Sequence, residues 1–283
     1  MITVINFAEG LPYSKYRKIC SKSARWIGGG ADNVIEYSAS DIEPSFIEKN
    51  KSIMSKKRGF GLWLWKPYFI NKTLKQMNDG DWLFYVDGCT MFVNDIHKLT
   101  ECADKQGQDI MLFEMPLIDR QFTKKECYVT MGITDYTQNQ LAATYICVKK
   151  TKKSCAFIKE WLQCCENEAL LSPDKFNPDI TDFPDFISHR EDQSLLTLMR
   201  IKCDLPVFRD PSDYGETPHM YFCSHYGYNV KEYPNSSYPT IVLSNRRNNP
   251  FLYLLRYKIK RVLRALGFIK PESIIRKKIE KGL

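Results

Sequence analysis

The sequence predicts an α/β fold with a mostly parallel central sheet. Short apolar runs rich in aromatic and β-branched residues recur along the chain, and helix-length segments separate them. Strands that alternate with helices are typical of βαβ units, in which neighbouring strands are parallel. One of these runs ends in Asp87 and Gly88. A polar residue that follows a strand of such a sheet lies at the edge where ligands bind.

Five strands are expected, each a run of apolar residues bounded by turn-forming or polar residues. They cover residues 1–8, 33–38, 81–87, 109–115 and 142–148. A helix is expected after Thr151, a favourable N-cap residue, because apolar residues follow it at helical spacing. A later helix carries Leu195, Leu196 and Met199 on its buried face.

The chain divides into a main domain, residues 1–245, and a tail, residues 246–283. No internal repeat or low-complexity linker interrupts the first part, and the polar stretch "SNRRNN" marks the break. The 283 residues are 43% hydrophobic and 26% charged, which is typical of a globular protein.

The cysteines indicate a reducing compartment. Ten cysteines are a low density for a disulfide scaffold, and the first residues lack the pattern of a secretory signal. We therefore expect a cytoplasmic protein with free thiols. No Cys-x-x-Cys pair is present, so a structural zinc site is not expected.

The net charge of +8 is confined to the tail. Residues 249–283 contain ten basic and two acidic side chains, whereas residues 1–248 contain 31 of each. The main domain is therefore not expected to bind nucleic acid through its charge.

The stretch "GDWLFYVDGCTMF", residues 80–92, is the first candidate site. A buried strand leads to Asp87, and Gly88 allows a ligand to come close to the backbone. The carboxylate of Asp87 would suit a divalent cation that holds a diphosphate. The alternative is an ordinary Asp-Gly turn after a strand.

The stretch "KKRGFGLWLWKPYFI", residues 56–70, is the second candidate site. Arg58, Gly61, Trp65 and Lys66 provide cations, close approach and a flat aromatic face, which suit a ligand carrying a diphosphate and a base. The alternative is the start of a helix with tryptophans in the core.

The stretch "FISHREDQSLLTLM", residues 186–199, is the third candidate site. Polar residues, among them His189, Arg190, Asp192 and Gln193, begin a helix with a buried face. The carboxylate and carboxamide could accept a proton from a hydroxyl group and hold an acceptor. The alternative is helix capping by Glu191 or Asp192.

The succession "RGFGLWLWKPY", "YVDGC", a Trp-bearing helix and "HREDQSLL" resembles a family of bacterial glycosyltransferases of the GT-A fold that assemble surface polysaccharides. The resemblance spans residues 1–228 and implies a nucleoside-diphosphate-sugar donor, typically a UDP-sugar. It places Asp87 at the first position of an Asp-x-Asp motif that binds Mn²⁺ or Mg²⁺, completed by the late His225. Here Cys89 occupies the third position, which leaves strict metal dependence open.

The resemblance also implies roles for the third candidate site. Asp192 would be the catalytic base if the transfer inverts configuration, and Gln193 would be the catalytic candidate instead if it retains configuration. His189 and Arg190 would contact the acceptor. The sugar, which could be galactose in pyranose or furanose form, would pass to a lipid-linked saccharide of a capsule or O-antigen.

Two rival functions are kept. One is sugar-1-phosphate nucleotidyl transfer, which is weakened because no glycine-rich phosphate loop follows the first strand. The other is a membrane-peripheral protein that binds nucleotide sugars or glycans without catalysis, which the missing second acid at Cys89 would permit. The sequence does not predict an oligomeric state.

The tail predicts a basic amphipathic helix. Leu252, Leu255, Ile259, Val262, Leu263 and Leu266 share one face, and Lys260, Arg261 and Arg264 lie opposite. Such a helix is too charged to span a bilayer but suits the anionic inner face of a plasma membrane. The alternative is a helix that packs on the main domain or on another subunit.

Overall fold

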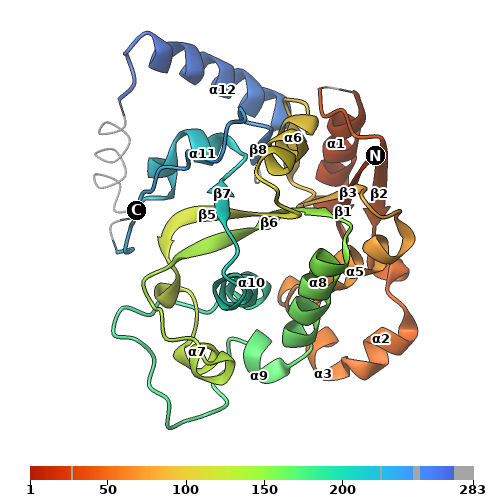
Figure 1. Ribbon diagram of the computed structural model, residues 1–283, viewed down its shortest axis with the longest axis vertical. Helices are drawn as coiled ribbons and strands as arrows, with labels where there is room; N and C mark the ends of the chain where they lie inside the picture. Colours follow the sequence, from red (N-terminus) through yellow and green to blue (C-terminus); the bar gives the residue numbers. More distant parts are fainter. Residues whose placement is uncertain (27, 224, 245–248, 271–283) are drawn as a thin grey trace.

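The computed structural model describes residues 1–270 apart from 27, 224 and 245–248. Its centre is a six-stranded sheet in the order β2-β1-β3-β6-β5-β7, with helices on both faces (Figure 1). The strands are β1 (Ile2–Phe7), β2 (Asn33–Tyr37), β3 (Trp82–Val86), β5 (Ile110–Ile118), β6 (Asn139–Lys149) and β7 (Val207–Arg209). Among these described strands, only β6 runs antiparallel to its neighbours. The prediction of an α/β fold with a mostly parallel sheet is confirmed.

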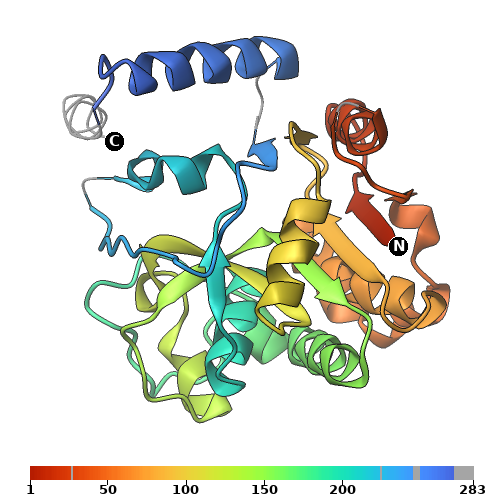
Figure 2. The same cartoon turned by 45° about the horizontal axis from the view of Figure 1, so that its top comes forward.

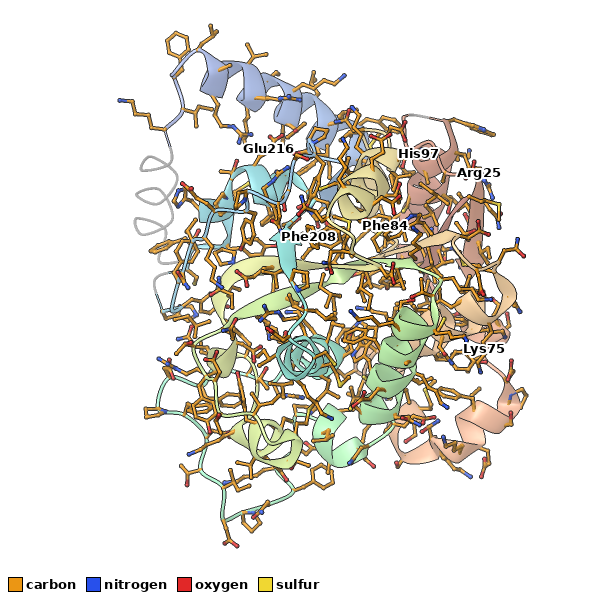
Figure 3. The ribbon with its side chains drawn as sticks, in the orientation of Figure 1. Arg25, Lys75, Phe84, His97, Phe208 and Glu216 are labelled. Atoms are coloured by element: carbon orange, nitrogen blue, oxygen red, sulfur yellow. The ribbon has the colours of Figure 1, made fainter. Side chains whose placement is uncertain are left out.

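Both faces of the sheet are buried, because alternate residues of each strand point to opposite sides. Leu83 and Tyr85 belong to the core beneath α5 (Trp65–Gln76), α8 (Lys152–Cys165) and α10 (Glu191–Lys202). Phe84 and Phe208, labelled in Figure 3, belong to the opposite core, which α1 (Tyr13–Trp26) and α6 (His97–Lys105) cover. Aromatic and branched side chains on both sides explain why these strands read as continuous apolar runs.

Shorter elements connect this framework. They are η1 (Ala39–Asp41), α2 (Pro44–Lys49), α3 (Lys51–Met54), α4 (Gly59–Leu62), η2 (Asp119–Gln121), α7 (Lys125–Met131), α9 (Glu168–Leu171), α11 (Asp213–Glu216) and η3 (Pro218–Tyr221). A separate antiparallel pair joins β4 (Thr90–Phe92) to β8 (Val242–Ser244).

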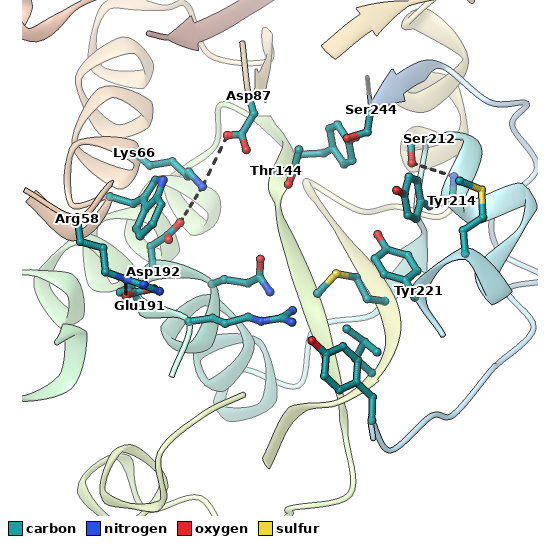
Figure 4. A pocket seen from close by; sticks show the side chains of 18 residues that line it. Arg58, Lys66, Asp87, Thr144, Glu191, Asp192, Ser212, Tyr214, Tyr221 and Ser244 are labelled. Atoms are coloured by element: carbon teal, nitrogen blue, oxygen red, sulfur yellow. Dashed lines mark hydrogen bonds and ion pairs between the residues drawn. The ribbon is translucent and has the colours of Figure 1, made fainter. Parts of the chain in front are cut away.

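The predicted helix starts are found where the sequence places them. Thr151 caps α8, since its hydroxyl oxygen accepts a hydrogen bond from the backbone nitrogen of Ser154 at 3.2 Å. In α10, Leu195, Leu196 and Met199 are buried. Because α10 begins below the carboxyl end of the sheet strands, its first turn faces the same edge as Asp87 (Figure 4).

The tail helix α12 (Pro250–Ala265) lies over α11 at one side of the molecule (Figure 2). It packs through two tyrosines: the Tyr253 hydroxyl donates to Asp213 Oδ2 at 2.6 Å, and the Tyr257 hydroxyl donates to Glu216 Oε1 at 3.0 Å. In Figure 3, Glu216 lies below this helix. The expected boundary near residue 245 and the last basic residues, 271–283, lie outside the described residues.

The apolar face of α12 points away from the main domain. Leu252, Leu255, Ile259, Val262 and Leu266 are each at least 50% exposed. The predicted amphipathic helix is therefore present, and its opposite face makes the contact with α11. Within the described ranges, no helix is long and apolar enough to cross a bilayer.

Candidate active site

A cavity of about 460 Å³ lies at the carboxyl edge of the sheet, and we call it the central cavity. Its residues come from the segment of α4 and α5, from the end of β3, from β5 and β6, from the first turn of α10, and from the region of α11, η3 and β8. Charged residues including Lys66, Asp87 and Asp192 occupy one side, and Tyr214 and Tyr221 lie on the other (Figure 4). This is the position that the strand-end Asp87 predicts.

Lys66 joins the two carboxylates of the central cavity. Its ammonium nitrogen lies 2.9 Å from Asp192 Oδ2 and 3.8 Å from Asp87 Oδ1, and it donates to the carbonyl oxygen of Ala143 at 3.1 Å. The side chains of Lys66 and Asp192 are 4% and 6% exposed. A buried charge must be paired to be tolerated, so each group of this pair depends on the other.

Burial and charge act in opposite directions on the pKa values of the Lys66–Asp192 pair. Burial lowers the pKa of Lys66, but the carboxylates of Asp192 and Asp87 outweigh this and hold the pKa above its usual value. Burial raises the pKa of Asp192, and the nearby Lys66 ammonium offsets part of that rise. Asp192 is therefore a stronger base than an exposed aspartate, and the Lys66 ammonium stabilises its charged form.

Asp87 is oriented by its neighbours. The Tyr85 hydroxyl donates to Asp87 Oδ1 at 2.6 Å, and the Asp87 backbone nitrogen donates to the carbonyl oxygen of Thr144 at 3.0 Å. Among the described residues, Asp87 Oδ2 takes part in no hydrogen bond. One carboxylate oxygen is thus available to a ligand.

The first turn of α10 holds two further polar groups at the central cavity. Gln140 Oε1 accepts from Arg190 Nη1 at 3.0 Å and from Gln193 Nε2 at 2.7 Å. Because a guanidinium only donates, the oxygen of Gln140 must face Arg190, and Gln193 must then present its nitrogen to Gln140. The side-chain carbonyl oxygen of Gln193 is then left as an acceptor for a ligand in the central cavity.

Arg58 is paired with the first residue of α10. Its Nε lies 2.5 Å from Glu191 Oε1, and Glu191 adopts a left-handed backbone conformation with φ of 37°. The guanidinium also lies 5.7 Å from the centre of the Trp63 ring. Arg58 therefore lines the central cavity as part of an ion pair that joins two distant segments of the chain.

A second cavity of about 430 Å³ adjoins the first, and we call it the aromatic cavity. Asp87 and Trp63 line both cavities. The other residues of the aromatic cavity are Phe7, Ala8, Glu9, Tyr13, Lys57, Gly59, Phe60, Trp65, Gly88 and Cys89. Trp65 stacks on Phe7 with ring centres 4.0 Å apart. Flat apolar surfaces with a lysine at the rim suit a nucleobase attached to phosphates.

A left-handed turn shapes the wall between the two cavities. Gly59, Phe60, Gly61, Leu62 and Trp63 all have positive φ, from 53° to 82°. This conformation costs about 1–2 kcal/mol per non-glycine residue. Strain of this kind persists where packing holds it and is common at functional sites. The expected start of a regular helix is thus displaced to Trp65.

The donor-binding residues predicted from sequence separate into two groups. Arg58 and Lys66 line the central cavity, Trp65 and Gly88 line the aromatic cavity, and Asp87 lines both. Gly61 lines neither; its missing side chain makes room for Met54, whose Sδ would lie 2.8 Å from an added Cβ. Gly61 therefore packs against the chain itself, and Gly59 is the glycine of this stretch that lines the aromatic cavity.

His189, which was expected to contact an acceptor, does not line the central cavity. His189 is buried beside α7, and its Nδ1 accepts from the backbone nitrogen of Lys124 at 3.4 Å. Burial lowers its pKa to about 3. Its neighbour Arg190 does line the central cavity. Successive residues before a helix point in different directions, which the sequence pattern alone does not resolve.

The predicted metal ligands are not assembled into a closed site. His225 is exposed, lies 3.2 Å from Cys223 Sγ through Nδ1, and lines neither the central nor the aromatic cavity. In the chain as described, no three His, Cys, Asp or Glu side chains form a metal-binding group. Asp87 does offer a free hard oxygen. Mg²⁺ often uses one carboxylate together with substrate phosphates and waters, so Asp87 fits a cation held jointly with a diphosphate.

The aromatic side of the central cavity was not predicted. Tyr145, Tyr214, Tyr221 and Tyr226 line it together with Met220. Three of the tyrosines lie between residues 214 and 226, a tyrosine-rich stretch that could have signalled a binding wall. Gln140 was missed as well, because a glutamine inside a buried strand carries no motif.

Comparisons with known proteins find similarity of structure only. No protein-family model matches the sequence, and a search of curated proteins finds no match. Mouse xyloside xylosyltransferase 1 in its apo form superposes with a TM-score of 0.48 and 9% identity, covering 88% of this chain and 99% of the other. The galactosyltransferase LgtC with donor and acceptor sugar analogues gives 0.48 and 13%, covering 85% and 86%. An active-site mutant of LgtC gives 0.43 and 14%, with the same coverage.

Proposed function

We propose that this protein is a glycosyltransferase of the GT-A type that uses a nucleoside-diphosphate sugar. The observation that carries the proposal is the position of Asp87, which lines both the aromatic and the central cavity and lies 3.8 Å from the ammonium of the Lys66–Asp192 pair. The middle part of a ligand that fills both cavities would lie beside Asp87. A nucleotide sugar, with a base at one end and a sugar at the other, has this layout.

The donor nucleoside is assigned to the aromatic cavity. Its base would stack among Phe60, Trp63 and Tyr13, and Lys57 would contact the phosphates. Gly88, whose added Cβ would lie 3.3 Å from the Phe7 carbonyl oxygen, keeps the backbone accessible at the diphosphate. The proposed donor is a UDP-sugar. A Mg²⁺ or Mn²⁺ ion held by Asp87 and the diphosphate would neutralise charge on the leaving group.

The sugar of the donor and the acceptor hydroxyl are assigned to the central cavity. The hydroxyl oxygen attacks the anomeric carbon, and the bond from that carbon to the diphosphate oxygen breaks. If configuration inverts, Asp192 accepts the hydroxyl proton, and Lys66 holds the carboxylate in place. If configuration is retained, the Gln193 carbonyl oxygen faces the anomeric carbon and the departing diphosphate takes the proton.

The acceptor is proposed to be a saccharide, because the tyrosine side of the central cavity suits the apolar face of a sugar ring. Arg190 would donate to its hydroxyl groups. Galactose, as pyranose or furanose, is the first donor sugar to test. The motif resemblance supports a role for this reaction in the assembly of a bacterial surface polysaccharide such as a capsule or O-antigen.

The tail is proposed to hold the enzyme at an anionic membrane. The exposed apolar face of α12 is the kind of surface that inserts at the level of lipid headgroups, and nearby cations strengthen such binding by about 1 kcal/mol each. A lipid-linked acceptor on the cytoplasmic side of the plasma membrane would then lie beside the central cavity.

A donor panel tests the function. Purified protein is incubated with UDP-, GDP- and dTDP-sugars, with and without a lipid-linked saccharide, and the nucleotide products are identified by mass spectrometry. We expect release of nucleoside diphosphate that the acceptor stimulates. Release of pyrophosphate would instead indicate nucleotidyl transfer, and binding without turnover would indicate a non-catalytic protein.

A further inference from the structure

A third cavity lies between α12 and α11, and we call it the tail cavity. Its volume is about 150 Å³, several times that of one water molecule, about 30 Å³. Met220 lines both the tail cavity and the central cavity, so the two adjoin across one side chain. The proposed reaction gives the tail cavity no role.

The wall that α12 contributes is strongly basic. Arg256, Lys260 and Arg264 are spaced four residues apart, which places them along one side of the helix. The Arg264 guanidinium contacts the Thr217 hydroxyl. Within the described segments, neither Arg256 nor Lys260 takes part in an ion pair or a side-chain hydrogen bond. Two cations therefore face the cavity without a fixed partner among those residues.

One carboxylate also lines the tail cavity, but it is already engaged. Asp213 Oδ2 accepts from the Tyr253 hydroxyl at 2.6 Å, and Oδ1 accepts from the backbone nitrogen of Ser244 at 3.3 Å. Three cations thus surround one hydrogen-bonded carboxylate, and the net charge of the wall is positive. Arginine and lysine in such numbers favour a phosphate, whose oxygens accept several charge-assisted hydrogen bonds.

The tail cavity lies between two surfaces with different proposed ligands. The central cavity on one side suits a sugar, and the exposed apolar side chains of α12 on the other suit lipid. A saccharide carried on a lipid phosphate or diphosphate has the same order: sugar, phosphate, hydrocarbon. The arrangement of the three surfaces therefore matches the three parts of such an acceptor.

We propose that the tail cavity binds the phosphate or diphosphate that links the acceptor sugar to its lipid. The inference rests on the proposed function and makes it more specific. Arg256 and Lys260 contact the phosphate oxygens, and Met220 separates the phosphate from the sugar in the central cavity. The tail helix would then recognise the substrate directly as well as holding the protein at a membrane.

The test compares two acceptors and two double variants. One acceptor carries the saccharide on a short, water-soluble alkyl diphosphate, and the other carries the same saccharide on a neutral alkyl chain. Arg256→Gln with Lys260→Gln removes the free cations of the tail cavity. Lys258→Gln with Arg261→Gln removes the same charge from exposed positions of α12 that line none of the three cavities. Thermal unfolding verifies that both variants fold.

We expect the tail-cavity variant to raise KM for the diphosphate acceptor on the order of tenfold, since it removes charge-assisted hydrogen bonds, with little change in kcat. Its KM for the neutral acceptor should equal that of the wild type, and the control variant should match the wild type on both. An equal KM for the diphosphate acceptor in all three proteins would overturn the inference while leaving the function intact. Absence of transfer by the wild type would instead refute the function itself.

A vesicle experiment distinguishes the acceptor phosphate from ordinary phospholipid headgroups. Binding to phosphatidylglycerol vesicles is measured by co-sedimentation for the same three proteins. The inference predicts that the tail-cavity variant and the control variant lose vesicle binding to the same small extent, because each loses the same charge. A selective loss in the tail-cavity variant, with unchanged KM for the diphosphate acceptor, would overturn the inference and assign the tail cavity to bulk phospholipid.

Discussion

At the scale of single residues, the active-site proposal depends on the pair formed by Lys66 and Asp192. The carboxylate is buried, lies 2.9 Å from the ammonium and lines the central cavity. A carboxylate in this setting can take a proton from a hydroxyl group without first losing a shell of water. The Asp87 carboxylate, which is 30% exposed, is more accessible and suits binding.

If the transfer inverts configuration, Asp192→Asn should abolish sugar transfer and leave donor binding intact. The amide keeps the shape of the side chain but cannot accept the proton, so kcat should fall while the dissociation constant for UDP-sugar, measured by calorimetry, stays unchanged. Asp79→Asn, which alters an exposed carboxylate, serves as the control and should behave as the wild type. Full transfer activity in the Asp192 variant would remove it from the chemistry.

The pH dependence follows from the same pair. Burial raises the pKa of Asp192 above its usual value. The base must be deprotonated to act, so activity is lost as the pH falls through this raised pKa. For an inverting reaction, the acidic limb of kcat/KM should therefore lie above the pKa of an ordinary aspartate, about 3.9. A limb at or below that value would argue against Asp192 as the base.

Asp87→Asn should lower turnover far more than stability. Its side chain lies at the cavity and contributes little packing, and the Tyr85 hydroxyl can still donate to an amide oxygen. We expect kcat to fall on the order of 10²-fold or more through weaker stabilisation of the leaving diphosphate. Wild-type turnover and donor affinity in this variant would exclude Asp87 from the site.

The cation makes a separate prediction, because Asp87 offers it a free carboxylate oxygen and the diphosphate would supply further oxygen ligands. Mn²⁺ should bind the wild-type protein weakly on its own and much more tightly when UDP is present. Calorimetric titration of Mn²⁺ with and without UDP measures the difference. Equal affinity in both titrations would indicate a complete protein site.

Sequence reasoning located the acidic and basic residues of the site better than the residues around them. Asp87 follows a strand, and the edge at which a parallel strand ends is fixed by topology. His189 and Gly61 were assigned ligand contacts, but the His189 side chain is buried and the Gly61 backbone packs against Met54. They lie in irregular segments, where the direction of each residue depends on packing with parts of the chain that are distant in sequence.

At the scale of elements, the left-handed turn at residues 59–63 is the feature that sequence periodicity does not reveal. Both glycines in this stretch have positive φ, which is a conformation that glycine adopts without steric cost. The turn delivers Trp63 to both cavities and Arg58 to Glu191. A regular helix through these residues would point them differently.

Gly61→Ala should destabilise the fold and disturb the site. The alanine would have to adopt a φ of 82°, and its Cβ would lie 2.8 Å from Met54 Sδ. We expect a loss of about 1–3 kcal/mol in the free energy of unfolding, measured with urea. Gly107→Ala is the matched control, because its φ is also positive, at 61°, but no atom lies near the added Cβ. Equal losses in both variants would mean that the contact with Met54 costs nothing.

The strands were predicted well and their ends less well. The five expected strands correspond to β1, β2, β3, β5 and β6, because long apolar runs with aromatic residues have few alternatives. The sequence did not predict β7, which has three residues and depends on pairing with β5 for its conformation. Tyr214, Tyr221 and Tyr226, which line the central cavity, follow β7 in the chain, so they were missed for the same reason.

At the scale of the whole molecule, the neutral main domain and the basic tail should separate in function. Removing residues 249–283 should leave a folded protein that is active on a water-soluble neutral acceptor and no longer binds anionic vesicles. Loss of Tyr253 and Tyr257, which pack on α11, should lower the melting temperature by a few degrees. Circular dichroism and vesicle co-sedimentation measure the two effects.

A milder variant separates the membrane contact from the docking of α12. Leu255→Ser with Ile259→Ser changes two exposed apolar side chains and leaves both tyrosines in place. Its stability should match the wild type, and its binding to anionic vesicles should fall. Raising the salt concentration should weaken wild-type binding through screening. Unchanged vesicle binding in this variant would place the membrane contact elsewhere.

The attachment of α12 to α11 also fixes the distance between the tail helix and the central cavity. Tyr253 bonds Asp213, and the next residue, Tyr214, lines the central cavity, so the wall of the cavity and the tail helix are fastened to one short element. With α12 in the headgroup layer, the cavity is held at a constant height above the bilayer. The protein would then select acceptors by length. Acceptors whose growing end reaches the cavity would be extended, and chains of a different length would be extended poorly whatever their sugars.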